Sequence, residues 1–141
     1  MYRRSKCHHE SMEPASQRLT DLRNGLLRLH KILLDSEQSS YERDVQRIAT
    51  RSELLGLVLN DPWFAYLHEL SELVVLIDET LESKDGVTTE EATRLIVQAR
   101  NLLTPAEQGS GFRKQYFEAL QRDPGVVIAH GEMMRVLSSL V

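Results

Sequence analysis

The residues best suited to chemistry in this 141-residue sequence are three ring-bearing side chains in one short segment: Trp63, Tyr66 and His68. They directly follow Asp61-Pro62, a pair typical of a helix start. A helix N-terminus offers free amides to an anion, although this aspartate can itself accept hydrogen bonds from them. Aromatic residues here are also typical of core or interface anchors. We expect such an anchor and keep a small-ligand site, or an enzyme site, at Trp63, Tyr66 and His68 as the alternative.

The segment from His68 to Glu72 partly resembles the zinc-binding helix of metalloproteases, in which a second histidine follows four residues after the first. Glu72 occupies that position here, and no further ligands are spaced to complete a site. We therefore expect a solvated helix face and no metal site. No glutamate stands three residues before His30, His68 or His130, which argues against a di-iron carboxylate bundle.

Two weaker alternatives involve the remaining reactive side chains. Cys7, His8 and His9 could bind a transition metal, since thiolate and imidazole are both good ligands, but their segment has no pattern that would hold them in a fixed geometry. We expect an incidental terminal sequence. A histidine phosphotransfer domain would match only His68 and Leu70, and the acidic flank of His68 would repel a phosphoryl group. We expect no catalytic residue and no cofactor.

Composition is typical of a globular, cytoplasmic protein. Hydrophobic residues make up 41% of the chain and charged residues 27%. The single cysteine excludes an internal disulfide framework and fits a reducing compartment. No apolar run follows the basic N-terminus as in a secretory signal, and the run near residues 70–77 is too short and too close to acids to span a bilayer. We expect no membrane partner.

Charge is distributed unevenly along the chain. Residues 1–51 carry a net charge of +3, residues 52–91 carry −9, and residues 92–141 carry +2. Such alternation is expected where antiparallel helices pack with complementary charges, within one subunit or between two. A nucleic-acid partner would require a concentrated basic face, and the sequence contains none.

Hydrophobic spacing predicts helices throughout residues 16–141, after a flexible arm at residues 1–15. The first helix, to about residue 48, has a heptad seam of leucines: Leu19, Leu22, Leu26, Leu29 and Leu33. Gly25 inside it suggests that a neighbouring backbone approaches closely. Capping-box patterns at residues 50–53 and 88–91 predict two further helix starts. Asp123-Pro124 predicts another, and a short aromatic helix from Phe112 precedes it.

The most apolar stretch predicts the central helix of the fold. After Pro62, Leu67, Leu70, Val74 and Ile77 keep a three-four spacing, and adjacent aliphatic residues widen this stripe. A helix that is apolar on more than one side requires several neighbours. We therefore predict an all-α fold, an antiparallel bundle of about six helices, four long and two short, arranged around the helix at about residues 62–83 and forming a single domain.

Three segments of the sequence, Leu54–Leu67, Ala119–Pro124 and Val127–His130, resemble a family of small all-helical bacterial proteins. The resemblance covers about residues 16–140. It implies a bacterial, cytoplasmic helical domain. Because the family has no established activity, the resemblance implies no catalytic residues.

The sequence thus favours a non-enzymatic interaction or regulatory module. It contains no nucleophile-base pair, phosphate-binding loop or metal cluster. Two wide apolar stripes, on the first helix and on the helix after Pro62, exceed what one bundle of this size can cover. We therefore expect a homodimer, anchored by an aromatic residue such as Trp63 or Phe64, with a different protein partner or a ligand as the alternative occupant.

Overall fold

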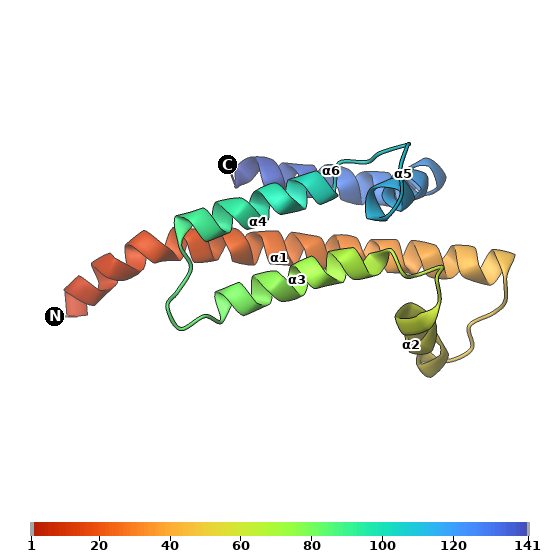
Figure 1. The fold of residues 1–141 in the computed structure, drawn as a ribbon, viewed down its shortest axis with the longest axis horizontal. Helices are drawn as coiled ribbons and strands as arrows, with labels where there is room; N and C mark the ends of the chain where they lie inside the picture. Colours follow the sequence, from red (N-terminus) through yellow and green to blue (C-terminus); the bar gives the residue numbers. More distant parts are fainter. Residues whose placement is uncertain (1, 141) are drawn as a thin grey trace.

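The computed structural model describes the backbone of residues 2–140 and the side chains from Pro14 onward. All regular structure in this part of the chain is helical, which confirms the predicted all-α class. The helices, shown in Figure 1, are α1 (Tyr2–Asp44), α2 (Arg51–Asn60), α3 (Leu67–Leu81), α4 (Thr89–Leu102), α5 (Phe112–Arg122) and α6 (Pro124–Ser139).

The central helix is α1, so the prediction that the helix after Pro62 holds the centre was wrong. Figure 1 shows α1 as the long axis of the molecule, and α3, α4 and α6 all pack against it. The reason lies in the leucine seam of α1. Each of its members is at most 1% exposed: Leu19, Leu22, Leu26, Leu29 and Leu33. The stripe of α3 is only partly covered, because Val75 and Leu76 remain exposed.

Hydrogen bonds fix the direction in which α3 and α6 lie along α1. Residue numbers rise on α1 as they fall on α3 in the pairs Arg23 with Asp78, His30 with Ser71, and Glu37 with Tyr66. At the other side of α1, Arg18 donates to the carbonyl of Leu140 at 3.0 Å, and Glu37 pairs with Arg122 just before α6 begins. Both α3 and α6 therefore run against the direction of α1.

The predicted caps start three of the helices. Thr50 accepts a hydrogen bond from the Glu53 amide at 3.1 Å, and Asp123 accepts one from the Gly125 amide at 2.8 Å. The capping box at Thr88 is reciprocal. The Thr88 hydroxyl accepts a 3.0 Å hydrogen bond from the Glu91 amide, and the Thr88 amide donates a 3.0 Å bond to the Glu91 carboxylate. These contacts satisfy amides that a helix start leaves free.

The start of α3 differs from the prediction. Asp61 accepts a hydrogen bond from the Trp63 amide at 2.8 Å, as expected, but the regular helix begins at Leu67 rather than at Pro62. Residues 61–66 instead form successive turns with backbone bonds three residues apart. This tighter winding places both Phe64 and Tyr66 in the core, where α-helical winding would separate them by 200°.

Two details of α1 also differ from the sequence expectation. The helix begins at Tyr2 and ends at Asp44, so it includes most of the predicted arm at residues 1–15 and stops short of Ile48. Independent motion of that arm stays a prediction. The close neighbour of Gly25 is a side chain rather than a backbone, since a Cβ there would lie 2.9 Å from the sulfur of Met133 on α6.

Candidate functional site

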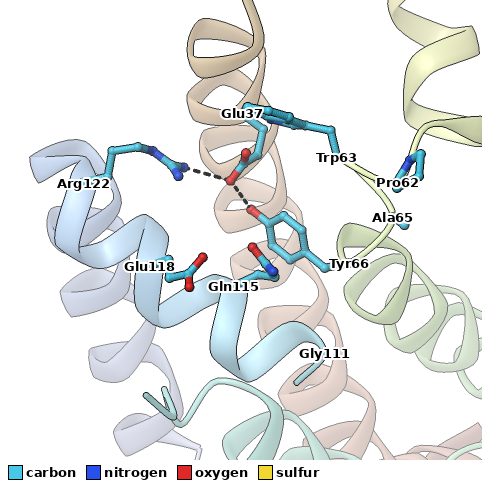
Figure 2. Close-up of a pocket in the computed structure, with 9 residues that line it drawn as sticks. All are labelled: Glu37, Pro62, Trp63, Ala65, Tyr66, Gly111, Gln115, Glu118 and Arg122. Atoms are coloured by element: carbon cyan, nitrogen blue, oxygen red, sulfur yellow. Dashed lines mark hydrogen bonds and ion pairs between the residues drawn. The ribbon is translucent and has the colours of Figure 1, made fainter. Parts of the chain in front are cut away.

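A cavity of about 520 Å³ lies where α1, the turns at residues 61–66 and α5 meet. We call it the Glu37 cavity (Figure 2), and its lining residues are Glu37, Pro62, Trp63, Ala65, Tyr66, Gly111, Gln115, Glu118 and Arg122. Two of the three side chains singled out in the sequence, Trp63 and Tyr66, are therefore among its walls. Its volume is in the range of pockets that hold small molecules.

The innermost charged group of this cavity is the carboxylate of Glu37, whose side chain is only 7% exposed. One of its oxygens, Oε2, accepts a hydrogen bond from the Tyr66 hydroxyl at 2.6 Å and another from Arg122 Nη2 at 2.8 Å. Figure 2 shows both side chains pointing to this one oxygen. A buried carboxylate is tolerated only where such partners replace water. The three residues thereby join α1, the turns at residues 61–66 and α5.

Tyr66 acts here as a hydrogen-bond donor and not as an acid. Burial, together with the negative charge of Glu37 and the hydrogen bond to it, raises the pKa of Tyr66 far above its usual range. The phenol therefore stays protonated at neutral pH. Its ring packs against Phe112 with centroids 5.7 Å apart, which holds the hydroxyl in position.

Two polar atoms in this neighbourhood have no partner among the described residues. Both side-chain hydrogen bonds of Glu37 end on Oε2, and no described residue donates to Oε1. The indole N–H of Trp63 is buried and has no acceptor. Trp63 itself is held edge-to-face against Tyr41, with ring centroids 5.6 Å apart. Most polar groups in such positions are hydrogen-bonded, to protein, water or ligand.

Carboxylates outnumber cations around the cavity. Arg122 is its single basic lining residue, against the carboxylates of Glu37 and Glu118, and Gln115 adds an uncharged amide. Arg122 also forms an ion pair with Glu37. Lys114 lies 3.3 Å from Glu118, but this pair is on the surface, where solvent screens it.

The third predicted side chain, His68, lies outside the lining of this cavity. Its Nε2 is 2.9 Å from the carbonyl oxygen of Val58, a contact that ties α3 to α2. His68 instead borders a shallow groove of about 390 Å³ between these helices. The structure thus brings Trp63 and Tyr66 together and places His68 with a different surface.

That groove forms part of an exposed apolar surface, which we call the α2–α3 face. We define this face by the residues that line the groove: Leu59, His68, Ser71, Glu72, Val75, Leu76 and Glu79. Leu59 is 58% exposed and Val75 is 53% exposed. The glutamates on α3 make its rim acidic. None of the residues of α2 is buried, although half of that helix is leucine or valine.

A second surface groove, of about 200 Å³, lies between α1 and α6. We call it the α1–α6 groove, and its lining residues are Gly25, Arg28, Leu29, Lys31, Ile32, Ala129, Glu132 and Met133. Arg28 and Lys31 are exposed, and Ile32 presents an apolar side chain between them and the helix α6. This groove therefore combines an apolar floor with a mainly basic rim.

Sequence reasoning missed Glu37 and Arg122. A signal for Glu37 was present, because Ser36, Glu37 and Ser40 continue the leucine seam of α1 and are all buried. A charged residue on such a seam indicates an internal partner. Arg122 carried no comparable signal, since only the packing of α5 on α1 brings it within reach of Glu37.

Two further histidines take part in polar contacts between helices. His30 Nε2 lies 3.0 Å from the Ser71 hydroxyl, which links α1 to α3. His130 Nδ1 lies 2.6 Å from the Tyr116 hydroxyl, which links α6 to α5. Burial lowers the pKa of His30 and that of His130, so both favour the neutral form.

For metals, the described residues contain no group of three or more His, Cys, Asp or Glu side chains that could hold an ion. The side chains of Cys7, His8 and His9 lie outside the described residues. Within residues 2–140, no helix is both long and apolar enough to cross a lipid bilayer.

Comparison of the chain with protein-family models, with curated proteins and with solved structures finds no match.

Proposed function

We propose that this protein is a helical interaction module that pairs with a second copy of itself through the α2–α3 face. The observation that carries this proposal is the exposure of the apolar helix α2. Its sequence includes Leu54, Leu55, Leu57, Val58 and Leu59, yet none of its residues is buried. An apolar helix left on the surface of a small protein is typical of a partner site.

The length of α2 adds a second reason. An isolated helix of ten residues is marginal in water, and most helix stability in proteins comes from packing an apolar face. Within one chain, Leu54, Leu57 and Val58 pack partly against the core, while Leu55 and Leu59 remain exposed. A second copy would cover the exposed side of α2 and stabilise it.

Charge complementarity favours a second copy of this chain over an unrelated protein. The α2–α3 face has an acidic rim at Glu72 and Glu79, and the α1–α6 groove has a basic rim at Arg28 and Lys31. These rims belong to sequence segments of opposite net charge. Since α3 packs directly on α1, the acidic face and the basic residues of α1 lie close together in each copy. In a two-fold dimer, the acidic face of each copy can therefore contact the basic residues of α1 in the other copy, and this contact occurs twice.

We further propose that the module works in the bacterial cytoplasm. The lone cysteine, Cys7, fits a reducing compartment, and the resemblance to small bacterial proteins supports the same assignment. Immunoblotting of cytoplasmic, periplasmic and membrane fractions from cells that express the natural chain tests it.

Light scattering coupled to size-exclusion chromatography tests the dimer at micromolar concentration. The expected mass is about twice the 16.2 kDa of one chain. Val75→Glu, on the α2–α3 face, should produce a monomer because it adds a like charge beside Glu72 and Glu79. Val97→Glu, at a similarly exposed position on α4, is the matched control and should remain a dimer. A wild-type mass near 16.2 kDa would reject the proposal.

A further inference from the structure

We infer that the Glu37 cavity binds a small organic amine in its ammonium form, with Glu37 Oε1 and the carboxylate of Glu118 as the hydrogen-bond acceptors. This site is separate from the proposed dimer contact, since the Glu37 cavity and the α2–α3 face share no lining residue. The two proposals can therefore fail independently.

The hydrogen bonds of Glu37 hold its carboxylate in one orientation. Its side chain is only 7% exposed, and its carboxylate is held by two donors from different elements, Tyr66 and Arg122, both on Oε2. These bonds fix the plane of the carboxylate and leave Oε1 without a donor among the described residues. Glu37 lines the cavity, so Oε1 is the acceptor that this side chain can still offer to a ligand. A donor that enters the cavity finds a positioned acceptor.

The charges that line the Glu37 cavity favour a cationic ligand over an anionic one. Glu37 and Arg122 compensate each other, and Glu118 adds one further negative charge to the cavity lining, because its partner Lys114 lies on the surface outside that lining. An anionic ligand would have to compete with Glu37 for Arg122 and would lie beside two carboxylates. A cation gains from both carboxylates and leaves the existing pair intact. Hydrogen bonds between charged groups are stronger than neutral ones, so the ammonium form is favoured over an alcohol of the same shape.

The polar and apolar lining residues of the cavity indicate the shape of the ligand. A primary ammonium group has three donors, and the lining contains three acceptors for them: Glu37 Oε1, the carboxylate of Glu118 and the amide oxygen of Gln115. Pro62, Trp63 and Ala65 line another part of the cavity and offer contact for an apolar body. The indole of Trp63 can add a cation–π contribution. The cavity therefore suits a compact molecule with one ammonium group on a short hydrocarbon chain.

Trp63 provides the assay, because it is the single tryptophan of the chain and lines the cavity. Three probes share a five-carbon skeleton and differ in their head group and its charge: n-pentylamine (cation), 1-pentanol (neutral) and pentanoate (anion). At pH 7.5 and low salt, pentylamine should change the Trp63 fluorescence saturably, with a Kd about 10-fold or more below that for pentanol, as a charge-assisted hydrogen bond implies. Pentanoate should bind more weakly than both. Equal affinities for the three probes, tighter binding of pentanoate, or no saturable change with pentylamine would each overturn the inference.

Two substitutions locate the effect. Glu37→Gln should remove most of the preference for the amine, but it also disturbs the pair with Arg122 and its folding must be checked by circular dichroism. Glu118→Gln avoids this difficulty, since Glu118 is exposed and its one ion pair is on the surface. It should weaken pentylamine binding several-fold and leave pentanol binding unchanged. Glu90→Gln, at an exposed position on α4, is the matched control. If Glu118→Gln and Glu90→Gln changed the Kd of pentylamine equally, the amine would bind outside the cavity and the inference would be rejected.

Discussion

Removing one hydroxyl from the centre of the Glu37 cavity should measurably destabilise the fold. In Tyr66→Phe the ring that packs on Phe112 is retained, and the lost group is the donor of the 2.6 Å bond to Glu37. A hydrogen bond to a charged partner contributes about 1.5–3 kcal/mol to stability. Glu37 keeps its bond from Arg122, so the cost should lie within that range and not reach the larger penalty of an unpaired buried carboxylate.

Urea denaturation followed by circular dichroism measures this cost as a lower transition midpoint with an unchanged slope. In a thermal scan the same loss corresponds to a decrease of roughly 4–12 °C in Tm for a chain of this size. Tyr41→Phe is the matched control: Tyr41 is also buried among aromatic rings, but its hydroxyl makes no hydrogen bond with a described residue. Its stability should change by less than about 0.5 kcal/mol. If Tyr66→Phe were as stable as the control, the carboxylate of Glu37 would have to be solvated. That result would refute the conclusion that the Tyr66 hydroxyl stabilises a buried carboxylate.

Three further predictions concern the core, the caps and pH. Leu70→Ala, at a fully buried position of α3, should cost about 2–5 kcal/mol in urea denaturation, and a curve that overlays wild type would mean that this stripe is not packed. Asp61→Ala, which removes the acceptor of the Trp63 amide in the turns before α3, should cost about 0.5–2 kcal/mol. Asp123→Ala, at the cap of the terminal helix α6, should cost less, and equal losses would contradict a central role for the turn at Asp61. Because burial lowers the folded-state pKa of His30 and of His130, their neutral forms contribute stability that is present above pH 6.5 and lost as pH falls below it. His130→Asn, whose amide can still accept from Tyr116, should show a smaller loss between pH 7 and pH 5, and an unchanged loss would exclude His130 as a cause.

Much of the local structure could be predicted from the sequence because its causes are local. The hydroxyl of Thr88 and the carboxylate of Glu91 cap a helix through contacts within one turn, so their spacing alone predicts the start of α4. The leucine seam of α1 is buried throughout, since a heptad spacing places its members on one side of a helix whatever that side meets. The all-α class follows from the same periodicity.

Predictions that depended on competition between surfaces were less accurate. The stripe of α3 is as apolar as that of α1, and nothing in either stripe says which helix will have more neighbours. α1 became central because it is long enough to contact α3, α4 and α6 at once. The start of α3 moved to Leu67 for a related reason: packing Phe64 and Tyr66 into the core stabilises more than regular helix geometry at residues 61–66.

The sequence by itself determined the helices, their caps and the buried side of α1, because each depends on residues a few positions apart. Tertiary structure alone decided which side chains share a site. Tyr66 and His68 are two residues apart, yet one donates to Glu37 and the other contacts Val58, since neighbouring positions on a helix face different directions. Glu37 and Arg122 are 85 residues apart and meet at 2.8 Å. A buried charge pair of this kind arises only when packing removes both groups from water together, and no local pattern in the chain records that event.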